Sequence, residues 1–72
     1  MTLVVEITQA DLMPDLMSGL ERSGCAADRV GPAAARVRDL RAASSEEARL
    51  ELAFFVRAWQ LSHPGVGVKI SE

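Results

Sequence analysis

The chain has little of what usually stabilises a very small domain. Among its 72 residues there is one cysteine, Cys25, and one histidine, His63. One cysteine excludes an internal disulfide, and two potential ligands fall short of the four that a structural zinc site normally needs. A domain of this size buries only about 60% of the surface that its unfolded chain exposes, so its stability margin is thin. We therefore expect no metal and no cofactor, and self-association as the remaining way to gain stability.

Long apolar runs and an excess of positive charge are also absent. The longest uninterrupted apolar run is residues 52–56, whereas a membrane-spanning helix needs roughly 20 such residues. Residues 1–6 lack the basic and apolar regions of a secretory signal. Eight basic and ten acidic residues give a net charge of −2, which does not attract nucleic acid over a distance. These absences predict a cytoplasmic protein that does not contact a membrane.

Aromatic residues are few, and all three lie in one segment that has clear helix signals. Ser44 and Ser45 are followed by Glu46 and Glu47, the pattern of an N-terminal cap, and Pro64-Gly65 provides a stop. A rotation of about 100° per residue places two apolar stripes on opposite faces of this helix. One stripe is Ala48, Leu52, Phe55, Val56 and Trp59, and the other is Leu50, Phe54, Ala58 and Leu61.

A surface helix of a globular protein needs only one apolar stripe to pack on the core. The second stripe therefore predicts either a helix through the middle of the monomer or an interface with another molecule. We interpret Leu50, Phe54 and Leu61 as the interaction residues, and we expect the partner to be a second copy of the chain.

The rest of the chain predicts two further helices and two short terminal strands. Alternation of apolar and polar residues favours strands at 2–8 and 66–70. Asp11 resembles a helix N-cap because that choice places Pro14 in the first turn, and Gly24 ends this helix. Residues 25–31 are interpreted as a connector. Pro32, followed by three alanines, then favours a second helix that ends near Ala43.

These elements predict a single domain over residues 1–72 of the α+β class, in the order β-α-α-α-β. Three helices that reverse direction at each turn return the chain parallel to its start, so the terminal strands would pair as a small parallel sheet, with Glu6 and Lys69 on its polar faces. A two-stranded sheet is marginal alone. Joining two copies edge to edge would extend the sheet to four strands, and a dimer through the long helix is the alternative.

Arginines are concentrated in the predicted second helix, at positions 36, 38 and 41. Arg36, Arg38 and Arg41 could contact phosphates, which gives an alternative function as an accessory regulator that binds nucleic acid. The overall acidic balance and the lack of aromatic residues among these arginines argue against it. We interpret the arginines as part of a solvated face with local ion pairs.

Catalytic side chains are scarce, so the sequence does not indicate an enzyme. No residue near Cys25 in sequence would plainly lower the pKa of its thiol, and His63 suits the last turn of the long helix. A small enzyme or an apolar-ligand domain is the third hypothesis, with no catalytic residue to name. The prediction is thus a small protein-interaction or assembly module that forms a homodimer, with neither nucleic acid nor a membrane as its partner.

Overall fold

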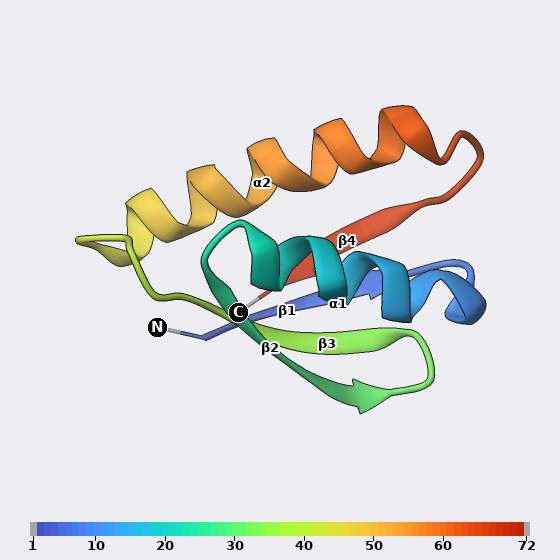
Figure 1. Cartoon of the computed structure of the whole chain (residues 1–72), viewed down its shortest axis with the longest axis horizontal. Helices are drawn as coiled ribbons and strands as arrows, with labels where there is room; N and C mark the ends of the chain where they lie inside the picture. The colour runs from blue at the N-terminus through green and yellow to red at the C-terminus, as the bar shows by residue number, and fades with distance from the viewer. Residues whose placement is uncertain (1, 72) are drawn as a thin grey trace.

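A computed structural model of the chain describes residues 2–71. Four strands and two α-helices follow one another in the order strand, helix, strand, strand, helix, strand (Figure 1). The strands pair in the order β2-β3-β1-β4, and every neighbouring pair is antiparallel. The elements are β1 (Leu3–Ile7), a 3-10 turn η1 (Ala10–Leu12), α1 (Met13–Arg22), β2 (Cys25–Gly31), β3 (Ala34–Asp39), α2 (Ser45–Ser62) and β4 (Val68–Ser71).

The predicted order β-α-α-α-β is wrong, although the α+β class is right. Residues 25–31 are a strand and not a connector, and the predicted second helix is instead a turn followed by β3. The terminal strands β1 and β4 are neighbours but run antiparallel, because four elements that each reverse the chain lie between them, where the sequence predicted three. Glu6 and Lys69 do lie opposite each other in this pair. The four strands therefore belong to one chain, without a second copy.

The β2–β3 hairpin forms where alanines favoured a helix. Ala35 and Val37 are buried while Arg36 and Arg38 are exposed, which is the alternation of a strand with one covered face. At the turn, the Arg29 side chain donates hydrogen bonds to the carbonyl oxygens of Gly31, at 3.2 Å, and Pro32, at 2.6 Å. Alanine's helix preference amounts to a few tenths of a kcal/mol per residue, roughly, so pairing in the sheet overrides it.

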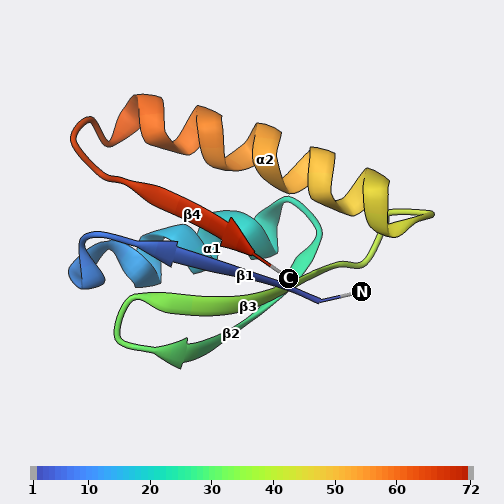
Figure 2. The same ribbon diagram turned by 180° about the vertical axis from the view of Figure 1, so that it is seen from behind.

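The molecule has two layers, with both helices on one side of the sheet. β1 buries Leu3, Val5 and Ile7 on the side that the helices cover. Figure 2 shows the sheet from the opposite side, where the strands lie in front of α1. α1 packs mainly on β2, and α2 on β3 and β4. This order and pairing form the split β-α-β arrangement, also called the ferredoxin-like topology, which by itself implies no function.

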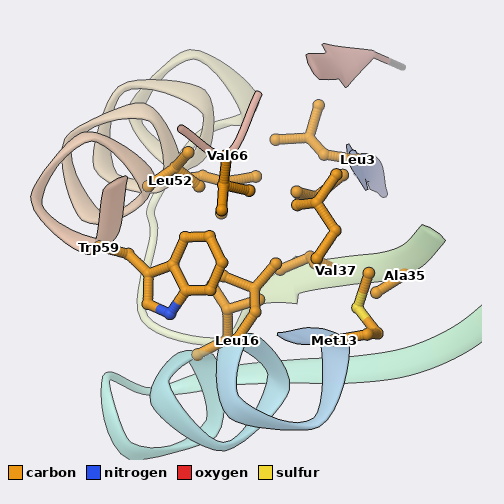
Figure 3. Close-up of a cluster of buried hydrophobic side chains, with 12 residues drawn as sticks. Leu3, Met13, Leu16, Ala35, Val37, Leu52, Trp59 and Val66 are labelled. Carbon is orange, nitrogen blue, oxygen red and sulfur yellow. The ribbon is translucent and has the colours of Figure 1, made fainter. Parts of the chain in front are cut away.

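Trp59 joins the two helices inside the core (Figure 3). Only 8% of its surface is exposed. Its indole Nε1–H donates a 3.0 Å hydrogen bond to Asp15 Oδ2 on α1. The His63 ring stacks on the indole with centroids 4.1 Å apart, and its Nε2 lies 3.3 Å from the same Asp15 oxygen. The predicted core position of Trp59 is confirmed.

The ends of α1 agree only in part with the sequence. Asp11 is not its N-cap: Asp11 belongs to the turn η1, and Leu12 precedes α1 without a side-chain cap. Pro14 lies in the first turn, as predicted. Gly24 follows the helix with φ of 98°, a conformation that favours glycine.

Candidate functional site

The candidate surface lies on α2, whose start is held by capping hydrogen bonds. The Ser44 Oγ accepts the N–H of Glu47 at 3.1 Å, and the Glu47 carboxylate accepts the N–H of Ala43 at 3.2 Å. These bonds satisfy N–H groups that have no partner within the helix. The predicted cap is confirmed, and α2 ends at Ser62, before Pro64 and Gly65.

The two faces of α2 meet different environments, as its sequence predicts. Ala48, Leu52, Val56 and Trp59 are buried, and Phe55 is half-buried. On the opposite face Leu50, Phe54 and Leu61 are 65%, 80% and 83% exposed. Ala58 lies between them and is also exposed. We call Leu50, Phe54, Ala58 and Leu61 the outer stripe.

The helix does not run through the middle of the monomer, so the first alternative left open by the sequence is excluded. Within the described chain nothing covers the outer stripe. Large apolar side chains that stand singly on a surface are common, but a continuous row of them marks an interaction site more often. That these residues bind a partner remains a prediction.

The outer stripe contains a shallow hollow. Phe54, Arg57, Ala58 and Leu61 line a depression of about 190 Å³. These positions are spaced i, i+3, i+4 and i+7, which is the spacing of four residues that receive one side chain of a facing helix. The small side chain of Ala58 leaves the room in the middle.

Charge is distributed unevenly along α2. Its first two turns carry Glu46, Glu47 and Glu51 with one basic residue, Arg49, between them. Arg57 is the only charged residue of the helix after Glu51. The two ends of the helix therefore present different potentials to a partner.

A second hollow, of about 270 Å³, lies beside α2 at the start of β2. Its lining is Ser23, Cys25, Asp39, Arg41, Glu51, Leu52, Phe54 and Phe55. Burial, and then the charge of Asp39, raise the pKa of the Cys25 thiol. A nucleophilic cysteine requires a lowered thiol pKa, because the thiolate is the reactive form.

Two carboxyl groups meet at the rim of this second hollow. The Arg41 N–H donates to Asp39, which lowers the pKa of Asp39, while a hydrogen bond with Asp39 raises the pKa of Glu51. Sequence reasoning missed this pair because Asp39 and Glu51 belong to separate elements whose approach is decided by tertiary packing. The two hollows share Phe54, which stands between them.

The arginines of the nucleic-acid hypothesis do not lie on a helix, which corrects that prediction. Arg36 and Arg38 project from β3 to the open face of the sheet. Arg36 lies between Asp28 of β2 and Val4 of β1. Arg41 follows β3, where its Nη2 donates a 2.8 Å hydrogen bond to the carbonyl of Ser23. The three side chains thus do not form one basic helix face.

Residues 2–71 contain neither a candidate metal centre nor a membrane-spanning helix. No three acidic, cysteine or histidine side chains of these residues are grouped so that they could hold a metal ion. Within the same range, neither helix has the length and apolar character needed to cross a membrane.

Comparisons with known proteins gave no further guidance. No family model, curated protein or solved structure matches this chain. The exposed surface of α2 is therefore the feature from which a function can be proposed.

Proposed function

We propose that the protein is a small interaction module that self-associates through the outer stripe of α2. The observation that supports this is the row of large apolar side chains, Leu50, Phe54 and Leu61, each at least 65% exposed. Removing apolar surface from water is favourable by about 25 cal/mol per Å². A row of this kind gains most when a matching apolar surface covers it.

The size of the chain supports the same proposal. A 72-residue domain has a small core, and a second subunit adds buried apolar surface without lengthening the chain. One helix face makes an interface at the small end of the range for specific complexes. We therefore expect a dissociation constant in the micromolar range.

Sedimentation equilibrium tests the proposal directly. The wild type should be dimeric at high micromolar concentration, and Phe54→Asp with Leu61→Asp should make it monomeric while helical circular dichroism is unchanged. The matched control is Val30→Asp with Leu40→Asp, which places the same two charges on apolar residues that are 47% and 66% exposed outside α2. It should remain dimeric. A wild type that is monomeric at this concentration would show that the proposal is wrong.

A further inference from the structure

We infer that the second copy binds antiparallel, with Phe54 of each α2 inserted into the hollow formed by Phe54, Arg57, Ala58 and Leu61 of the other. This inference rests on the proposed self-association and adds its geometry. Three features of the outer face of α2 lead to it: the symmetry of the stripe, the position of the hollow and the distribution of charge.

The outer stripe can pair with the outer stripe of a second copy that runs in the opposite direction. It runs from Leu50 to Leu61, so its midpoint along the helix axis lies between residues 55 and 56. In an antiparallel pair whose two-fold axis passes at this height, residues equally far from the midpoint face each other. Leu50 then faces Leu61 of the other copy, and both exposed leucines are covered.

The same register brings Phe54 to the hollow. The hollow is centred between Arg57 and Ala58, and Phe54 faces this level on the other copy. Phe54 is 80% exposed, so its ring is available for insertion. The guanidinium of Arg57 at the rim can then lie against the ring as a cation–π contact. A symmetric dimer requires that each copy carry both the inserted side chain and the hollow that receives it on the same face. The outer face of α2 carries both.

Charge favours the antiparallel over the parallel orientation. A parallel copy would place Glu46, Glu47 and Glu51 beside their own counterparts and would align the two helix dipoles. In the antiparallel register the nearest of these like pairs, the two copies of Glu51, are about 14 Å apart along the axis, and the two copies of Glu47 about 25 Å, at 1.5 Å per residue. Both distances exceed the screening length of about 8–10 Å in physiological salt. The repulsion is therefore largely screened.

The first test fills the hollow. Ala58→Leu enlarges the exposed apolar surface but occupies the space for Phe54 of the other copy, so the dissociation constant should rise about tenfold or more. Ala53→Leu is the matched control: Ala53 is also exposed on α2, but it lines a different groove with Val68 and Ile70 of β4. It should change the dissociation constant less than about twofold. If Ala58→Leu strengthens association, the inference is wrong, because association then follows apolar area alone.

The second test determines whether the α2 helices of the two copies run antiparallel. Leu50→Cys and Leu61→Cys are made as two separate variants, each in a Cys25→Ala background, and one of the two is isotopically labelled. Each variant is oxidised alone, and the two are also oxidised together as a mixture. The antiparallel register places Leu50 beside Leu61 of the other copy but separates identical positions by about 16 Å along the axis. A disulfide needs Cα atoms within about 7 Å. Mass spectrometry should therefore find cross-links only in the mixture.

The outcomes separate the inference from the proposed function. Cross-links of each variant with itself, or none in a dimeric mixture, would overturn the antiparallel register and leave self-association intact. A wild type that is monomeric at high micromolar concentration would overturn both.

Discussion

Trp59 shows what a single side chain contributes to this fold. It lies on the buried face of α2, packs among residues of both helices and the sheet, and donates its indole N–H to Asp15. Phe54, five residues earlier, points the opposite way into solvent. Two aromatic residues of one helix thus have different roles: one stabilises the monomer, and the other is available to a partner.

At this scale we predict that Trp59→Ala lowers the free energy of unfolding by about 3–5 kcal/mol. This is a large part of the total for a chain of this size. Trp59→Phe keeps most of the apolar volume and loses mainly the bond to Asp15, so it should cost less. Urea denaturation followed by circular dichroism, at a concentration where the protein is monomeric, measures both.

Phe54→Ala is the control for that series. Because the ring is exposed in the monomer, its removal should change the free energy of unfolding by less than about 0.5 kcal/mol. A Trp59→Ala variant with a wild-type urea midpoint would contradict the role of Trp59 as a core residue.

Each of the two α-helices is followed by a glycine with a positive φ, and the two glycines have different surroundings. Gly24 follows α1 with φ of 98°, and Gly65 follows α2 with φ of 90°. A Cβ added at Gly65 would meet no atom within 4 Å, whereas one at Gly24 would lie 2.6 Å from Arg41 Nε. The junction after α1 is therefore constrained by its neighbour as well as by its dihedral angle.

We predict that Gly65→Ala costs about 1–3 kcal/mol of stability from backbone strain alone. Gly24→Ala should cost more, because it also displaces Arg41 from its hydrogen bond to Ser23. In an Arg41→Ala background the cost of Gly24→Ala should fall to that of Gly65→Ala. Urea denaturation of the single and double variants measures this coupling. Equal costs of Gly24→Ala in both backgrounds would show that Arg41 is not involved.

At the scale of the whole molecule, neither helix within residues 2–71 covers the second face of the sheet, and the chemistry of that face bears on nucleic-acid binding. Arg36 has Asp28 and Val4 as its cross-strand neighbours, and Lys69 faces Glu6. All three aromatic residues lie on α2, so this face has no ring on which a base could stack. Both features weaken a sheet-face interaction with RNA or DNA.

We predict that the wild type shows no saturable binding to labelled DNA or RNA at physiological salt. Weak binding at low salt should decrease steeply as salt is added. Titrations of the wild type and of Arg36→Ala with Arg38→Ala measure this. Micromolar binding at moderate salt that the double variant abolishes would contradict the prediction.

The elements that the sequence determined have strong local signals. β1 alternates apolar and polar residues, and α2 has a cap, a stop and an apolar stripe that repeats with the helical period. The outer stripe follows from the same periodicity, so the amino-acid sequence is enough to identify Leu50, Phe54 and Leu61. That they are exposed in the monomer is a property of the fold.

Only the tertiary structure decided the middle of the chain and the relations between elements. Residues 25–39 are rich in alanine, and their alternation of small buried residues with arginines is a weak signal beside alanine's helix preference. They become strands because β1 supplies an edge with unpaired backbone groups and α1 covers the resulting face. The same long-range pairing made β1 and β4 antiparallel and brought Asp39 to Glu51. Such contacts depend on residues far apart in the chain, and no short stretch of sequence encodes them.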